Sequence, residues 1–330
     1  MKNKKSKVFF IISSIFIAVL HLSCTLPIEI AVERKALFIG ISDYITLPDP
    51  GPGSGRDLRY PDNDATDFAD LLEGQKWTVN RNLINPEYGD LAPGQTIASK
   101  TVASKNAIRS EINSWFSDLD MNGIALIYFS GHGYEESRTA YLVAADYVAG
   151  SASAFISAAE LSAWIIESIP SNITKNVIVI VDSCFSGGFV SSRESSDVIP
   201  QSYIPYGTNS SVSALAALGQ FGDLLAANAA EKGLLAPIVI SAAGSTELSY
   251  EDYPPESQYY LGYANGVFTE FLLEAAVYGD ANRDGFVTCT EAYTYAARAI
   301  DKNWNRTIDS SAAFYPHISG GLRDLVLFTN

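Results

Sequence analysis

The chain has few cysteines and few basic residues. Only three of its 330 residues are cysteines, Cys24, Cys184 and Cys289, whereas small secreted proteins stabilised by disulfides carry many more. Lysine and arginine number 22 against 37 aspartates and glutamates, a net charge of −15. An acidic chain does not bind nucleic acid or anionic lipid through bulk charge. The two shortages exclude a disulfide scaffold and a general nucleic-acid binder, and they favour reactivity as the reason for Cys184.

Long hydrophobic runs are also scarce, and no stretch after residue 24 is apolar enough to span a membrane. Four lysines among the first seven residues precede an apolar run of 13 residues, Val8 to Leu20, which is too short for a transmembrane helix. This pattern predicts a secretory signal peptide over residues 1–23, followed by a tether over residues 24–34. Removal of residues 1–23 leaves 307 residues with a net charge of −19.

Cys24 directly follows the signal peptide and predicts a lipid anchor. Leu22-Ser23-Cys24 resembles the processing site of bacterial lipoproteins, in which the cysteine carries the lipid. The sequence departs from that pattern at His21, where the family has leucine; here the leucine is Leu20. We therefore expect an exported, membrane-anchored lipoprotein. The alternative is ordinary signal cleavage and a secreted or periplasmic protein.

Two apolar runs define the centre of the remaining chain. Val177–Val181 leads into Asp182–Cys184, and Ile124–Phe129 leads into Ser130–His132. Runs too short for a helix and without polar alternation are typical of strands buried on both faces, which belong to parallel sheets covered by helices. Ligand and catalytic sites of such sheets lie at the carboxyl ends of the strands. We therefore expect Cys184 and His132 to emerge at the same edge.

Further strands and helices alternate along the chain. Strands are predicted over residues 36–41, 77–83, 236–242 and 325–328, and helices over 63–72, 105–119, 158–169, 268–278 and 292–300. This alternation predicts one α/β domain over residues 35–330, a three-layer αβα sandwich with a mostly parallel central sheet. Residues 185–235 have weak periodicity and predict a long functional loop. Arg193, Asp197 and Lys232 are candidate sites of proteolytic processing in it.

Two motifs resemble those of the caspase-like peptidases. Tyr-Phe-Ser-Gly-His-Gly over 128–133 and Asp-Ser-Cys-Phe-Ser-Gly over 182–187 resemble the histidine and cysteine motifs of the metacaspase and bacterial caspase-like branch. His132 and Cys184 are 52 positions apart, close to the separation of about 50 in caspases. Residues 36–44, 63–65 and 238–243 extend the resemblance to nearly all of the mature chain. It implies a caspase-like fold and a cysteine endopeptidase that acts on protein or peptide substrates.

The resemblance implies a dyad of Cys184 and His132. A cysteine with a free pKa of about 8.5 is mostly protonated at neutral pH, so the histidine must take its proton. The backbone N–H groups of Gly133 and Cys184 are expected to hold the oxyanion. The alternatives are a Cys184–Cys289 disulfide, which abolishes the nucleophile, and a non-catalytic binding or scaffold module at the cell surface with an idle dyad.

The resemblance also implies a pocket for arginine or lysine at P1, the residue before the scissile bond. Asp64, Ser130 and Asp182 match the pocket positions of metacaspases. Two carboxylates in a partly buried pocket favour a cation and reject an acidic side chain. The alternative roles are structural, because Asp182 also ends its predicted strand and Asp64 is also placed to cap its predicted helix.

Residues 280–291 match the twelve-residue calcium loop of the EF-hand. The expected ligands are Asp280, Asn282, Asp284, the backbone carbonyl of Phe286, and Glu291. Calcium in a structural role is therefore the one cofactor that we expect, with no organic cofactor. The alternative is an acidic turn in which Glu291 caps the next helix, because a single loop lacks the usual paired partner.

Overall fold

The computed structural model describes residues 32–44, 57–85, 102–120, 122–136, 139–148, 151–168, 176–183, 237–243, 249–252, 260–307, 313–320 and 324–329. All the elements that follow lie in one compact unit, Glu33–Asn330. Several predictions of the sequence lie outside the described residues. They are the signal peptide with Cys24, the nucleophile Cys184, and the 185–235 interval with Arg193, Asp197 and Lys232.

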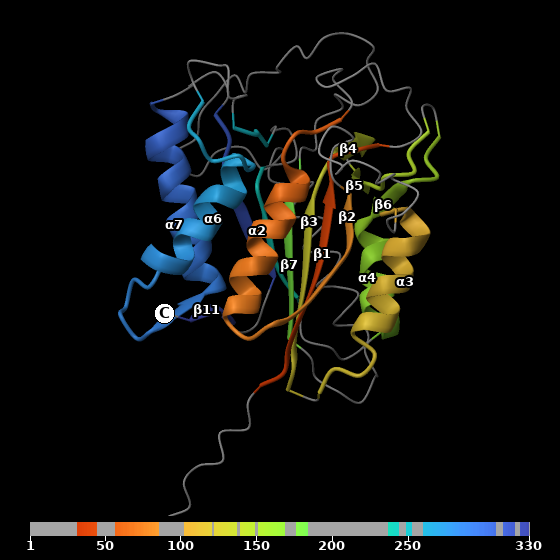
Figure 1. The fold of residues 1–330 in the computed structure, drawn as a ribbon, viewed down its shortest axis with the longest axis horizontal. Helices are drawn as coiled ribbons and strands as arrows, with labels where there is room; N and C mark the ends of the chain where they lie inside the picture. The colour runs from red at the N-terminus through yellow and green to blue at the C-terminus, as the bar shows by residue number, and fades with distance from the viewer. Residues whose placement is uncertain are drawn as a thin grey trace, which may run out of the picture. The chain divides into compact units, whose positions relative to one another are not determined.

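A six-stranded sheet in the order β10-β8-β7-β3-β1-β2 forms the centre of this unit (Figure 1). The strands are β1 (Arg34–Ile41), β2 (Thr78–Asn85), β3 (Ile124–Ser130), β7 (Asn176–Asp182), β8 (Ile238–Ser241) and β10 (His317–Gly320). Only β10 runs antiparallel to its neighbour within this sheet. The predicted α/β class with a mostly parallel sheet is therefore confirmed.

Both faces of the sheet are buried, which explains the unbroken apolar runs. In β3, Ala125, Ile127 and Phe129 belong to one hydrophobic core, whereas Leu126 and Tyr128 belong to the other. Since successive side chains of a strand point to opposite faces, a strand covered on both sides carries no polar row. The two cores and the sheet between them make up the predicted three layers.

Helices α3 (Lys105–Trp115) and α4 (Ala158–Ser168) cover the first face. The Ser104 hydroxyl caps α3 by accepting from the Ala107 N–H at 3.2 Å, and Ile108 and Ile112 bury one side of this helix. A small antiparallel sheet of β4 (Gly133–Glu136), β5 (Thr139–Val143) and β6 (Phe155–Ser157) adds to this side. Its strands are short and were not predicted.

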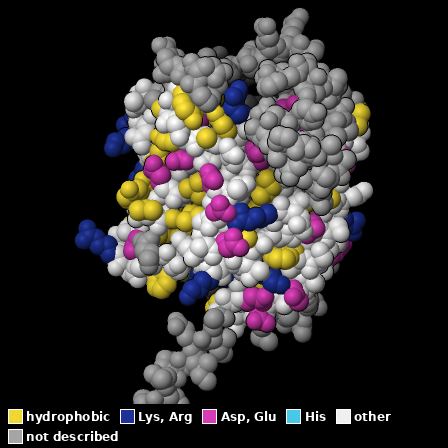
Figure 2. All heavy atoms as spheres, in the orientation of Figure 1, with side chains coloured by type: hydrophobic (Ala, Val, Ile, Leu, Met, Phe, Trp, Pro, Cys, Tyr) yellow, Lys and Arg dark blue, Asp and Glu magenta, His cyan; other side chains and the backbone are white. Residues whose placement is uncertain are grey.

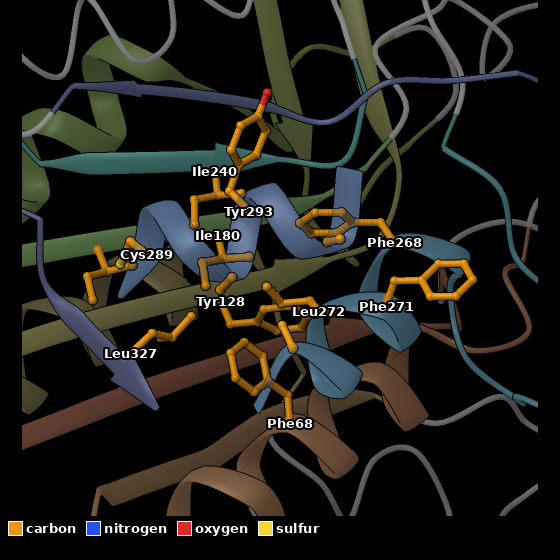
Figure 3. Packing of buried hydrophobic residues seen from close by; sticks show 14 of the residues in the cluster. Phe68, Tyr128, Ile180, Ile240, Phe268, Phe271, Leu272, Cys289, Tyr293 and Leu327 are labelled. Atoms are coloured by element: carbon orange, nitrogen blue, oxygen red, sulfur yellow. The ribbon is translucent and has the colours of Figure 1, made fainter. Parts of the chain in front are cut away.

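Helices α2 (Pro61–Gly74), α6 (Val267–Tyr278) and α7 (Cys289–Ile300) cover the second face, and a π-helical turn η3 (Asp301–Asn305) continues α7. Figure 3 shows the packing of this core, in which Phe68 of α2 meets Tyr128 of β3 edge-on with ring centroids 5.2 Å apart. Cys289 lies in the same core as a free, buried thiol. The structure therefore does not support the disulfide alternative.

One detail of the predicted elements was wrong. Helix α2 begins at Pro61 with Tyr60 as its N-cap residue, so Asp64 lies inside the helix and does not cap it. Proline suits this first position because its fixed φ is helical and its missing N–H has no partner to lose there. The strand predicted at 325–328 is β11 (Val326–Thr329), which pairs with β9 (Phe286–Thr288) and not with the central sheet.

The face seen in Figure 2 carries acidic and basic side chains interspersed with apolar ones. No helix within the described ranges combines the length and the apolarity needed to cross a bilayer.

Candidate active site

His132 follows the carboxyl end of β3, at the edge of the sheet to which β1, β3 and β7 all point (Figure 1). The parallel register of β3 and β7 pairs Ser130 with Asp182. These two residues come two positions before His132 and Cys184, respectively. The Gly131 N–H donates to the Asp182 carbonyl at 3.2 Å, which keeps the two strands paired past the end of β3. The backbone thus brings His132 and Ser183, the residue before Cys184, to the same edge.

Tyr44 holds His132 in place. The His132 N–H donates to the Tyr44 hydroxyl oxygen at 2.6 Å, and the two ring centroids are 4.8 Å apart. On the other side, the His132 carbonyl accepts from the Val143 N–H at 3.0 Å. Tyr44 is 1 % exposed, and its own N–H donates to the Asp57 carboxylate at 3.1 Å. The histidine backbone is therefore fixed by two separate segments.

Gly133, the second expected oxyanion donor besides Cys184, is the first residue of β4 and is buried. It lies opposite Leu142 of β5. Because β4 starts directly after His132, the Gly133 backbone is held by the same small sheet that holds the histidine carbonyl.

Asp64 is buried on α2 beside the end of β3. One of its carboxylate oxygens accepts from the Ser130 hydroxyl at 2.7 Å, and the other accepts from the Gly266 N–H at 2.6 Å. The predicted pair of Asp64 and Ser130 is thus brought together over 66 positions of sequence.

Asp182 is the last residue of β7, and its carboxylate is also buried. It accepts hydrogen bonds from the hydroxyl of Ser249 and, at 2.7 Å, from that of Thr269 on α6. The Thr269 hydroxyl, whose proton is directed to Asp182, accepts from the hydroxyl of Tyr128 at 2.6 Å. Asp182 therefore ends its strand and anchors a buried hydroxyl network at the same time.

The two carboxylates both lie against the backbone of Gly266. A Cβ atom at this glycine would lie 2.6 Å from an oxygen of Asp182 and 3.0 Å from an oxygen of Asp64. Any larger residue would displace one of them, so glycine is required here by space. Asp64 and Asp182 are 2 % and 5 % exposed, and no ion pair among the described residues involves either of them.

Burial and mutual repulsion act on this acidic pair. Burial raises the pKa of Asp64 well above its usual range, and the nearby charge of Asp182 raises it further, against the hydrogen bonds from Ser130 and Gly266. Burial likewise raises the pKa of Asp182, against its hydrogen bonds from Ser249 and Thr269. A cation bound beside both carboxylates would hold them ionised, because its charge offsets the effects of burial and of repulsion.

Glu251 connects the acidic pair to the start of α2. Its carboxylate accepts from the N–H groups of Arg59 and Tyr60, each at 2.8 Å, just before the helix that carries Asp64. Burial raises its pKa to about 7, and the charge of Asp182 adds to the shift. The short segment 249–252 therefore supports both acids, through Ser249 and through Glu251.

The loop after α6 has several features of a calcium loop. The Asp280 carboxylate accepts from the N–H groups of Arg283, at 2.6 Å, and of Gly285, at 3.0 Å, and Asn282 and Asp284 accept from N–H groups two residues further on. Gly285 has a φ of +87°, a value that glycine adopts without strain. Residues 286–288 form β9, which pairs with β11. Strand β11 therefore pairs with this loop in the way that a second calcium loop does in paired EF-hands.

Glu291, the last residue of this loop, binds Thr288. Its carboxylate accepts from the Thr288 N–H and hydroxyl, both at 3.0 Å, while the Thr288 hydroxyl accepts from the Glu291 N–H, which makes a capping box at the start of α7. Within the part of the chain that the structure describes, no three carboxylate, histidine or cysteine side chains come close enough to hold a metal ion. Asp280, Asn282 and Asp284 therefore hold the turn of the loop through backbone N–H groups, and Glu291 is in its capping position.

The fold and the site agree with a known family. The family model described as the caspase domain matches residues 33–298, which is most of the chain. This chain belongs to the caspase-domain family. Membership supports a cysteine peptidase, a hydrolase of protein or peptide substrates. A comparison with curated protein sequences finds no significant match.

The solved structure of an insect caspase shows the same fold as this caspase domain. Caspase-1 from Spodoptera frugiperda is similar with a TM-score of 0.52 and 12 % sequence identity, over 90 % of this chain and 91 % of that chain. A protein from Geobacter sulfurreducens has a TM-score of 0.46 and 14 % identity, over 89 % of this chain and 95 % of that chain. The identities are low, so the likeness to caspase-1 supports the fold alone.

Sequence reasoning missed four residues of this caspase-domain site: Tyr44, Ser249, Glu251 and Thr269. Each reaches the site from an element far away in sequence, and none lies in a motif with a chemical signature. Tyr44 follows the first strand directly, and its place at a strand end was the one available signal.

Proposed function

We propose that this caspase domain is a cysteine endopeptidase that uses Cys184 as nucleophile and His132 as its acid–base partner. The observation that carries the proposal is the register of β3 and β7. This register pairs Ser130, at the end of β3, with Asp182, at the end of β7. His132 and Cys184 each follow two residues later in the sequence. Neighbouring strands lie about 4.8 Å apart, a spacing that side chains leaving their ends can bridge.

The proposed reaction needs these two side chains and the backbone around them. His132 takes the proton of the Cys184 thiol, and the thiolate attacks the peptide carbonyl carbon to form a carbon–sulfur bond. N–H groups of Gly133 and Cys184 stabilise the oxyanion. The carbon–nitrogen bond then breaks as His132 gives its proton to the leaving amine. Water, deprotonated by His132, hydrolyses the thioester and regenerates the thiol.

We further propose that the enzyme cleaves after arginine or lysine. The support is the acidic pair, because Asp64 and Asp182 are buried side by side without an ion-pair partner in the described residues. Buried like charges are unfavourable, and a P1 cation relieves that repulsion. An acidic P1 side chain would add a third negative charge and would be rejected.

The test is a positional-scanning peptide library cleaved by the mature chain, with Cys184→Ala as the matched control. The proposal expects cleavage after arginine and lysine and not after aspartate, with no cleavage by the variant. Cleavage after aspartate would contradict the specificity, while equal activity of Cys184→Ala would contradict the dyad. No cleavage of any peptide by a folded, thiol-reduced enzyme would favour the binding or scaffold alternative.

We also propose that loop 280–291 binds calcium as a structural ion. Asp280, Asn282, Asp284 and the carbonyl of Phe286 would supply ligands, and Glu291 would leave Thr288 to complete the set. Three carboxylates within twelve residues repel one another unless a cation is present. Because the loop joins α6 and α7, calcium would act first on stability.

Export and lipid attachment at Cys24 complete the proposal. Expression of the full chain in a bacterial host would test it by partition into detergent. Wild type is expected in the detergent phase, and Cys24→Ser in the aqueous phase. Equal partition of the two would favour a secreted or periplasmic protein without lipid.

A further inference from the structure

An aromatic face covers one side of the small sheet next to His132. Tyr134 of β4 lies directly opposite Tyr141 of β5, and both rings contact Phe155 of β6, with centroids 4.5 Å and 5.6 Å away. Tyr147 stacks on Phe155 from the following loop, at 5.6 Å. We call Tyr134, Tyr141 and Phe155 the aromatic face. Phe155 is buried, whereas Tyr134 and Tyr141 are partly exposed.

His132 belongs to the same side of this sheet. Its carbonyl accepts from the Val143 N–H, which extends the β4–β5 ladder by one step beyond the pair of Gly133 and Leu142. His132 therefore stands opposite Val143. Since side chains alternate along a strand, His132 lies on the side of Tyr134, two residues further on. The aromatic face thus begins directly beside the histidine.

The aromatic face and the acidic pair lie on opposite sides of the central sheet. Tyr134, Tyr141 and Phe155 pack in or against the first core, together with Tyr44. Asp64 belongs to α2, and Asp182 is bonded to Thr269 of α6, two helices of the second face. His132 is at the sheet edge between them. A peptide with its P1 side chain at the acidic pair must therefore cross His132 to reach the aromatic face.

We propose that the aromatic face is the subsite for the residue after the scissile bond, P1′, and that it takes aromatic or large apolar side chains. The inference rests on the proposed peptidase function. His132 must approach the leaving amine, which is the nitrogen of the P1′ residue. The P1′ side chain leaves the backbone one bond away from that nitrogen, so it meets the surface next to His132. Tyr134 and Tyr141 offer it partly exposed rings, and aromatic pairs stabilise contacts beyond the area that they bury.

The test uses two internally quenched peptides that carry arginine at P1 and differ only at P1′, phenylalanine in one and alanine in the other. The readout is the ratio of their kcat/KM values, which cancels any change in enzyme concentration or in the dyad. Wild type is expected to prefer phenylalanine by about tenfold, the size of one good aromatic contact. Tyr141→Ala is expected to bring the ratio close to one, and Tyr134→Leu, which keeps apolar volume in the sheet, to lower it.

Tyr278→Ala is the matched control, because Tyr278 is 68 % exposed at the end of α6, on the second face. It should leave the ratio at the wild-type value. A wild-type ratio near one, or a ratio unchanged in both Tyr141→Ala and Tyr134→Leu, would overturn the subsite while cleavage after arginine still supports the proposed function. If the folded wild type cleaves neither peptide, both the proposed function and the subsite are refuted.

Discussion

Replacement of Asp182 by asparagine is expected to weaken recognition of a P1 cation without unfolding the protein. The asparagine oxygen can still accept from the hydroxyl and the N–H of Thr269, and its amide can donate to the Ser249 hydroxyl, which is only partly buried and can turn its own proton outward. The variant therefore keeps the buried hydrogen bonds of Thr269. It also removes a like charge beside Asp64, so the melting temperature at pH 7–8 should stay the same or rise.

The expected loss in kcat/KM for an arginine substrate is about 100-fold, or about 3 kcal/mol, which lies in the range for removal of one partner of a buried charge pair. The sharpest assay compares peptides with arginine and with citrulline at P1, because citrulline has nearly the shape of arginine and no charge. The ratio of their kcat/KM values should fall strongly in Asp182→Asn.

Asp70→Asn is the control for net charge. Asp70 lies on the same helix as Asp64, but its side chain is 66 % exposed and pairs with Arg81. This variant should leave the arginine-to-citrulline ratio unchanged. If Asp182→Asn has the same arginine-to-citrulline ratio as wild type, the acidic pair does not recognise the charge of the P1 side chain.

Three further predictions follow from the contacts of single side chains. Tyr44→Phe keeps the ring beside His132 and removes its hydrogen-bond acceptor, so kcat should fall about tenfold at unchanged KM; a rise in KM alone would contradict the positioning role. Glu251 has a pKa raised from 4.5 to about 7 in the folded protein, so the folded state binds its proton more tightly and stability falls by about 3 kcal/mol as the pH rises from 4 to above 7. Glu251→Gln should flatten that decline in a series of melting curves, and an unchanged series would show that Glu251 does not cause it. Millimolar calcium should raise the melting temperature by several degrees over chelator. Glu291→Gln, which keeps the capping box, should abolish that shift; an equal shift in the variant would show that the loop does not bind the ion.

The central sheet could be predicted because its strands are buried on both faces. β1, β3 and β7 appear in the sequence as continuous apolar runs, and the residues just after β3 and β7 carry the chemistry. The small strands β4, β5 and β6 contain three to five residues each, too few to establish a period. Strand β10 is equally short and sits at the edge of the sheet.

The candidate site could be predicted only where a motif carries it. The acids of the pair were found through their motif positions, but their supports come from far along the chain, such as Gly266, which lies 202 positions after Asp64. Tertiary contacts of this kind leave no local pattern. At Glu291 a motif was present but ambiguous, because the position of this glutamate matches both a calcium loop and a capping box. Spacing alone does not choose between them.

Covalent labelling by an arginine chloromethylketone peptide tests whether Cys184 is a nucleophile that His132 activates. The mature chain contains Cys289 as an internal control, since it is fully buried and its thiol pKa is raised by that burial. Mass spectrometry is expected to find the label on Cys184 and not on Cys289, and His132→Ala is expected to slow the labelling. Failure of Cys184 to react in the folded enzyme, or labelling that is equally fast without His132, would contradict the proposed dyad.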